Sequence, residues 1–124
     1  MKWTILLATI VCTLLPLSPA FAVEQAVIVH FEYGSIDLTR LFVLEDKIDA
    51  ALKASGAGEF DGDEMAVDGS HGTLYMYGQS ADRLFDAVEP ILKTADFMSG
   101  AEAIKRYGPA NSSARETSTI MTQD

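Results

Sequence analysis

The chain has a single cysteine, Cys12, and two histidines among its 124 residues. Cys12 lies in an apolar run near the N-terminus, so the rest of the chain is free of cysteine. A disulfide framework, a cysteine-based metal site and a cysteine nucleophile are therefore excluded from that remainder. Two histidines are also few for a metal centre, because such a centre usually needs three or four convergent ligands.

Basic residues are scarce as well. The 9 lysines and arginines are outnumbered by 18 aspartates and glutamates, which gives a formal net charge of −9. The basic residues are scattered singly, apart from the pair Lys105-Arg106. Nucleic acids and anionic lipids bind clustered cations. The composition therefore excludes nucleic acid as the expected partner.

Residues 1–22 are typical of a cleavable secretory signal. Lys2 forms a short positive region, Trp3–Leu15 carry no charge, and Ala20-Phe21-Ala22 has the small-x-small pattern of a cleavage site. The apolar run is too short for a good membrane-spanning helix, and the segment that follows it is rich in proline. We therefore expect cleavage after Ala22, a periplasmic or secreted protein, and no stable insertion into a membrane.

Residues 23–109 are predicted to form one α+β domain. β-Branched and aromatic runs predict strands, and apolar residues at spacings of three and four predict two helices. The strands are expected at Ala26–Tyr33, Glu59–Asp68, Thr73–Tyr77 and Ala101–Tyr107, and the helices around Leu41–Leu52 and Leu84–Leu92. The order βαββαβ predicts a ferredoxin-like fold, in which both helices cover one face of an antiparallel sheet. The first and third strands are expected in its centre and the other two at its edges.

Local residues predict how several of these elements begin and end. Ser80 is a good N-cap for the second helix, and Gly56 is well placed to end the first. Pro90 should bend the second helix or split off its last turn. The run Asp61-Gly62-Asp63-Glu64 contains poor strand formers, which favours an edge strand with a bulge or a wide loop. In the first helix, Glu45 is expected on the solvent side.

The last residues of the chain are mostly polar. Residues 110–124 contain Asn, Ser, Thr and charged side chains, with Ile120 and Met121 as the large apolar groups. This composition predicts a flexible C-terminal tail. A short final strand around Ser118–Met121 is the alternative.

Three runs carry a resemblance to known proteins: Asp68–Gly78, Ala81–Phe85 and Arg106–Pro109. In these runs the chain resembles small, uncharacterised bacterial ferredoxin-like α/β proteins. The resemblance extends from the first strand to Pro109 and implies the fold, but it carries no activity. Some small domains of this general kind resemble immunity proteins of bacterial toxin systems.

The sheet face that the helices leave open is the predicted binding surface. Side chains of a strand alternate between its two faces. If the helices cover Val27 and every second residue after it, the opposite face is left open. His30, Glu32, Tyr75 and Tyr77 then project together from the two central strands on that open face. We expect this face to bind another protein or a second copy of the chain. The alternative is that the tyrosines are strand formers that cover an otherwise bare sheet.

Two further sites are weighed on their spacing. His30 and Glu32 lie about 7 Å apart on one strand face, as an acid–base or metal pair would, but His71 is expected too far away to complete a site. The acidic residues Asp61, Asp63, Glu64 and Asp68 invite a calcium interpretation. The EF-hand pattern fails, however, because Met65, Ala66 and Gly72 occupy its fifth, sixth and twelfth positions. A weak cation site of another kind stays open.

These patterns together predict an exported, non-catalytic interaction domain without cofactor or metal. One alternative is an immunity-type inhibitor of a toxin that acts in the periplasm. The other is a small hydrolase or metal enzyme that uses His30 and Glu32.

Overall fold

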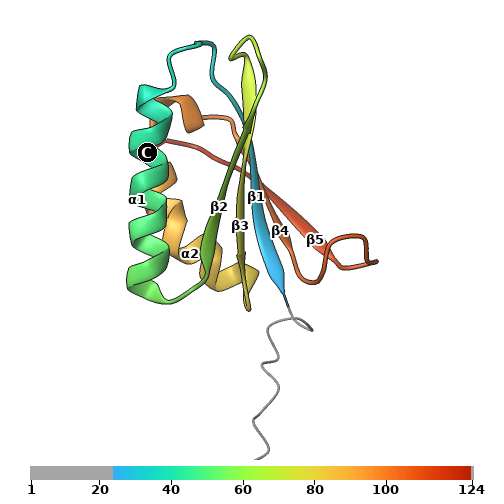
Figure 1. The fold of residues 1–124 in the computed structure, drawn as a ribbon. Coiled ribbons are helices and arrows are strands. Elements are labelled where there is room, and N and C mark those ends of the chain that lie inside the picture. The colour runs from blue at the N-terminus through green and yellow to red at the C-terminus, as the bar shows by residue number, and fades with distance from the viewer. Residues whose placement is uncertain (1–23, 124) are drawn as a thin grey trace, which may run out of the picture.

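The computed structural model describes residues 24–123. The predicted signal, residues 1–22, lies outside the described residues. Five strands and two α-helices follow one another, with a short 3-10 helix, η2, before the fourth strand (Figure 1). Their bounds are β1 Gln25–Glu32, α1 Thr39–Ser55, β2 Glu59–Met65, β3 His71–Gly78, α2 Ala81–Leu92, η2 Asp96–Met98, β4 Glu102–Arg106 and β5 Glu116–Ile120.

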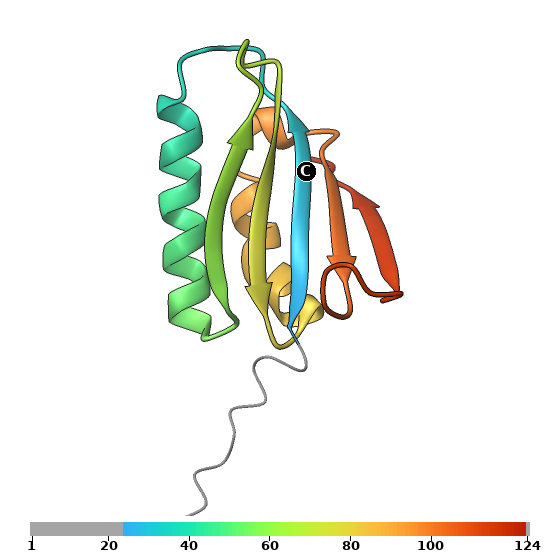
Figure 2. The ribbon, with the colours of Figure 1, turned by 45° about the vertical axis from the view of Figure 1, so that its right-hand side comes forward.

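All five strands belong to one antiparallel sheet, and the predicted α+β class is confirmed. The order of the strands is β2-β3-β1-β4-β5 (Figure 2). Strand β1 is bonded on both sides, to β3 from Gln25↔Gly78 to Glu32↔His71 and to β4 from Ala26↔Arg106 to His30↔Glu102.

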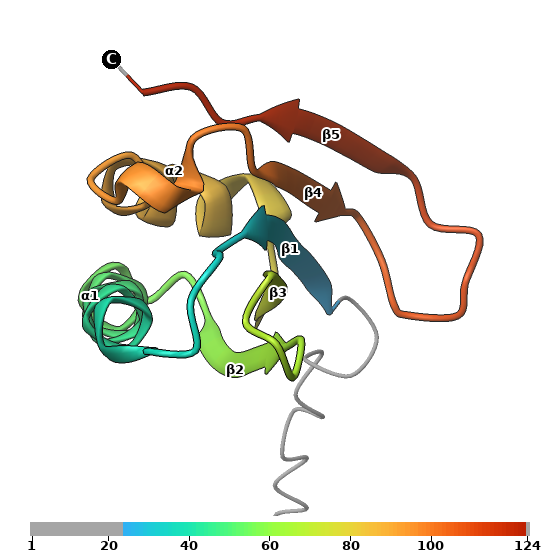
Figure 3. The same cartoon turned by 90° about the horizontal axis from the view of Figure 1, so that it is seen from above.

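Both helices lie on the same side of the sheet (Figure 3). Helix α2 packs on β1, β3 and β4, whereas α1 packs on α2 and on β2. The side chains of β1 that face the helices, Val27, Val29 and Phe31, are at most 3% exposed. Those between them point the other way, and His30 and Glu32 are exposed. One face of the sheet is therefore the core, and the other is open.

The helix ends agree with most of the local signals. The Oγ of Ser80 accepts a hydrogen bond from the backbone N–H of Arg83, so it caps α2 as predicted. Gly56 ends α1 in the left-handed conformation, with φ 66°. Helix α2 continues two residues past Pro90, to Leu92. Within the described residues, no helix combines the length and apolar character that crossing a membrane requires.

Strand β2 is an edge strand with an irregularity, as its acidic run predicts. Its pairing with β3 shifts register between Phe60 and Asp63, and Gly62 there has a φ of 97°. Glycine adopts this conformation at little steric cost. The shift places Asp63 opposite the buried Leu74, on the helix-covered side, and Glu64 opposite Thr73, on the open side.

Residues 116–120 form a strand, β5, and not the flexible C-terminal tail that the composition predicts. A short final strand was the alternative prediction. Strand β5 pairs with β4 from Glu102↔Ile120 to Arg106↔Glu116. The expectation that the fourth strand forms an edge of the sheet is therefore wrong, because β5 takes that place. Met121, which follows β5, is 3% exposed and belongs to the core, so it fixes the end of the strand against the body of the domain.

Glu45 on α1 is buried, in contrast to its predicted position on the solvent side. It is 8% exposed and is the one charged residue buried among residues 24–123. The register shift in β2 brings Asp63 to the same interface, where the two carboxyl groups share a hydrogen bond. Burial, the Asp63 carboxylate and the charge of Asp46 raise the pKa of Glu45 to about 8.

This raised pKa predicts a specific dependence of stability on pH. Between the ordinary pKa of Glu45, 4.5, and about 8, the folded chain holds a proton that the unfolded chain has lost. The contribution of this group is therefore complete below pH 4.5 and is lost as the pH rises to about 8. We expect Glu45→Gln to remove at least about 1 kcal/mol of this pH-dependent loss. Urea unfolding at a series of pH values measures it.

The matched control is Asp46→Asn, because Asp46 is the exposed neighbour of Glu45 on the same helix. This substitution should leave most of the slope of stability against pH in place. A Glu45→Gln curve that runs parallel to that of the unaltered protein between pH 5 and 8 would contradict the assignment, since this range lies within the window set by the two pKa values.

Candidate functional site

The open face has a partly covered apolar centre. Ile28 of β1 lies opposite Tyr75 of β3 on one side and Ile104 of β4 on the other. All three side chains are half-buried although no helix lies over them. We call this line of three residues across the middle of the sheet the central row.

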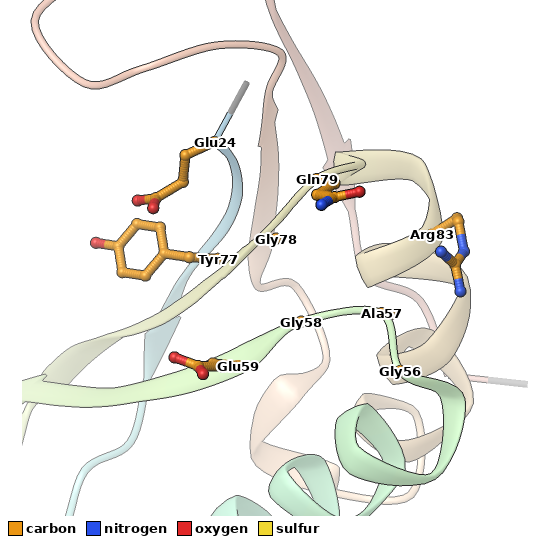
Figure 4. Close-up of a pocket in the computed structure, with 9 residues that line it drawn as sticks. All are labelled: Glu24, Gly56, Ala57, Gly58, Glu59, Tyr77, Gly78, Gln79 and Arg83. Atoms are coloured by element: carbon orange, nitrogen blue, oxygen red, sulfur yellow. The ribbon is translucent and has the colours of Figure 1, made fainter. Parts of the chain in front are cut away.

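Tyr77 lies beside the central row, toward the end of the sheet that Figure 4 shows. The side chains of Glu24 and Glu59 flank its ring, and Glu59 is its partner in the pairing of β2 with β3 (Figure 4). A hollow of about 400 Å³ extends from Tyr77 past the Gly56-Ala57-Gly58 turn to Arg83. Arg83 lies on the far side of this turn and donates to the carbonyl of Ser55 at 3.3 Å. The glycine turn therefore separates the acidic side of this hollow from its basic side.

The two histidines lie near the other end of the open face and line the same hollow. His71 is directly opposite Glu32 in the pairing of β1 with β3, and His30 is opposite Glu102 of β4. These four side chains line one hollow of about 380 Å³, together with Phe31, Gly72, Thr73, Ser99 and Gly100. The Nδ1 of His30 lies 2.9 Å from the Oγ1 of Thr73. The third strand begins at His71 itself, which places His71 beside the end of β1. That His71 is too far from the strand centre to complete a site with His30 and Glu32 stays a prediction.

Carboxylates surround the central row. Five of them reach the open face from four different strands: Glu32, Glu59, Glu64, Glu102 and Glu116. The basic side chain that the same register places on this face is Arg106, opposite Glu116. We call these five carboxylates the acidic rim. The open face thus has an apolar centre and a negative border.

Burial and nearby carboxylates raise the pKa of the two tyrosines. Burial, followed by a hydrogen bond to Glu64, raises the pKa of Tyr75; its hydroxyl donates to Oε2 of Glu64 at 3.2 Å. Burial and the nearby Asp61 raise the pKa of Tyr77, an effect that Arg106 opposes. Both hydroxyls therefore stay protonated over the physiological range, so each keeps its O–H as a hydrogen-bond donor, and that of Tyr75 is used by Glu64.

The hydroxyl of Ser70 is not arranged as a nucleophile. It donates to Oδ1 of Asp68 at 2.6 Å and lies 2.9 Å from Nδ1 of His71. A histidine that activates a serine must accept the hydroxyl proton, but here the hydroxyl donates its hydrogen bond to Asp68. In this arrangement Asp68 is the acceptor of the hydrogen bond that Ser70 donates.

The acidic residues of β2 and of the turn that follows it do not converge on a cation site. Asp63 faces Glu45, Glu64 accepts from Tyr75, and Asp68 accepts from Ser70. Across residues 24–123, no three His, Cys, Asp or Glu side chains are grouped so that they could hold a metal ion. These three carboxylates therefore interact with different partners in different parts of the domain.

The structure brings the four predicted binding residues onto one face but adds others that sequence reasoning missed. His30, Glu32, Tyr75 and Tyr77 share the open face through the pairing of β1 with β3. Ile104 and Glu102 join them from β4. Strict alternation along Glu102-Ala103-Ile104 was the signal that would have found these two residues. Glu64 had no such signal, since the register shift in β2 decides its direction.

Comparisons of the chain with models of known protein families, with curated proteins and with solved structures find no match. The resemblance to small bacterial ferredoxin-like proteins therefore stays a prediction.

The contact between Tyr75 and Glu64 predicts a measurable titration. Loss of the carboxylate in Glu64→Gln should lower the pKa of Tyr75, because a charged acceptor favours the protonated phenol. Tyr77 is the internal control, since Glu64 is the last of the influences on its pKa. NMR titration of the tyrosine ring signals separates the two residues. An equal shift at both tyrosines, or none at Tyr75, would contradict the contact.

Proposed function

We propose that this chain is an exported, non-catalytic binding domain that recognises a basic protein through its open sheet face. The observation that carries the proposal is the central row, Tyr75, Ile28 and Ile104, surrounded by the acidic rim. An apolar centre within a polar border is the usual anatomy of a protein–protein interface. Aromatic residues near the centre of such a face supply much of the binding energy.

The charge of the face selects the partner. The five carboxylates of the acidic rim attract lysine and arginine side chains, and the whole chain has a net charge of −9. Complementary charge raises the rate of encounter and rejects acidic competitors. A basic protein with an apolar or aromatic anchor fits both the centre and the border of the face.

The proposed topology is ferredoxin-like over residues 25–106. The strand order β2-β3-β1-β4, with a helix after β1 and another after β3, supports it. This topology leaves one side of the sheet free for binding, since both helices take the other side. Strand β5 is an addition to that arrangement and widens the open face.

An inhibitor of a basic toxin in the periplasm is a specific version of the proposal. It requires the export that residues 1–22 predict, and it uses the same acidic face. The hydrolase alternative has less support from the geometry, because the hydroxyl of Ser70 is directed to Asp68 and His30 is engaged with Thr73. The grouping of His30, His71, Glu32 and Glu102 is better suited to the acidic end of a binding surface.

Replacement of both tyrosines tests the proposal. The double variant Tyr75→Ala, Tyr77→Ala should weaken capture of a basic partner from an envelope extract at least about tenfold, because it removes the aromatic part of the face. Raising the salt concentration should weaken the unaltered protein's binding in the same assay, since exposed charges are screened.

The matched control is Phe42→Ala with Val43→Ala on α1. These side chains are 53% and 51% exposed and lie outside the open face, so the control removes exposed apolar surface from the helical side. Binding by this control should stay within about twofold of that of the unaltered protein. Binding lost in the control and kept in the tyrosine variant would place the interface on the helices and refute the proposal.

A further inference from the structure

The two edges of the sheet are built differently. At the β2 edge, a register shift, Gly62 and the run of carboxylates interrupt regular pairing, and α1 packs beside the strand. Such features keep an edge from pairing with another chain. Strand β5 forms the other edge with five exposed residues, regular pairing to β4, and neither proline nor lysine. The β5 edge therefore lacks the register shift, the run of carboxylates and the adjacent helix that hinder pairing of the β2 edge with another chain.

The backbone groups of β5 that point outward are set by its pairing with β4. The N–H of Met121 donates to the carbonyl of Ala101, and the N–H of Tyr107 donates to the carbonyl of Arg115. In an antiparallel ladder these bonded positions recur at every second residue. Residues 115, 117, 119 and 121 therefore bond inward. Glu116, Ser118 and Ile120 direct their N–H and carbonyl groups to the free edge, which lies clear of other described segments (Figure 3).

We propose that this edge binds a second copy of the chain, with the two β5 strands antiparallel and Ser118 opposite Ser118 of the other copy. This register is self-complementary. Each outward-directed residue then meets another, because Glu116 lies opposite Ile120 of the second copy and Ile120 lies opposite its Glu116. All three outward positions exchange backbone hydrogen bonds in pairs.

The side chains suit the same register. Glu116 faces an isoleucine and not a second glutamate, so no like charges are directly opposed. On the helical side, Thr117 meets Thr119 of the second copy, and threonine pairs across strands are favourable. Ile120 is 57% exposed in the single chain, and it gains cover from the aliphatic part of the opposing Glu116. A shift by two residues, the smallest that keeps outward-directed positions opposite one another, would instead place Glu116 opposite Ser118 and leave Ile120 without a strand neighbour.

Pairing of this kind joins the two open faces. The two-fold axis passes between the two opposing Ser118 residues and runs perpendicular to the sheet. The two sheets therefore continue into one another with both open faces on the same side. The inference rests on the edge and not on the central row, so it stands or falls independently of the proposed partner. Edge pairing buries little surface, and both copies are negatively charged. The dimer should therefore be weak and should strengthen with salt.

Sedimentation equilibrium over a range of concentrations tests the dimer, with the protein expressed from its complete coding sequence. We expect a reversible dimer with a dissociation constant between about 1 µM and about 1 mM. Ser118→Pro should weaken it at least about tenfold, because proline removes the outward N–H while the bonds to β4 are kept. Ser118→Ala is the matched control. It removes the hydroxyl that donates to Glu102 at 2.8 Å but keeps the N–H, so dimerisation should persist.

A charge exchange tests the register itself. Ile120→Glu should weaken the dimer by placing a carboxylate opposite Glu116 of the second copy. Adding Glu116→Lys should restore it, because a lysine then lies opposite the new carboxylate. Structural damage from either substitution would not be repaired by the second.

Three results would overturn the inference. The first is a chain that stays monomeric up to about 1 mM at high salt. The second is a dimer that Ser118→Pro leaves intact and Tyr75→Ala with Tyr77→Ala abolishes, which would place self-association on the open face. The third is a charge exchange that fails to restore the dimer after Ile120→Glu has weakened it, in a double variant whose β5 still pairs with β4 by amide NMR, since the new carboxylate also lies opposite Glu102 of its own chain.

Discussion

The structure depends on the hydrogen bonding of β1 to strands on both of its edges. Its ladders with β3 and β4 extend along most of its length and fix which residues of three strands share a face. Val27, Val29 and Phe31 then form the floor of the core, and the intervening residues have no place except the open face. Ile28 can align with Tyr75 and Ile104 because both ladders are regular. A slip of one residue in either ladder would exchange core and surface.

The placement of the acidic residues follows from the irregularity in β2. The shift after Phe60 sends Asp63 toward α1, where it meets the buried Glu45, and sends Glu64 toward the open face, where it meets Tyr75. One local distortion thus supplies both the carboxyl pair inside the domain and part of the acidic rim outside it. It also interrupts pairing along the β2 edge, so that the regular free edge of the sheet is β5.

The sequence was sufficient to predict the elements whose patterns are strong. Alternation in β1, the apolar stripe of α2, the cap at Ser80 and the turn at Gly56 all have short-range causes. Strand β5 has polar residues on both faces, so no alternation marked it, and it forms because β4 offers a bonding partner. The burial of Glu45 was hidden for a similar reason. Helix α1 packs against β2, a strand distant in the sequence, and local periodicity does not report such a contact.

The central claim is that partners bind the open face. NMR mapping of the backbone amides, with a captured basic partner titrated into the labelled protein, tests it most directly. The account predicts that the perturbed amides cluster in β1, β3 and β4 around Ile28, Tyr75 and Ile104, while those around Phe42 and Val43 stay unchanged. Perturbations that cluster on α1 and α2 and leave the central row unaffected would contradict it.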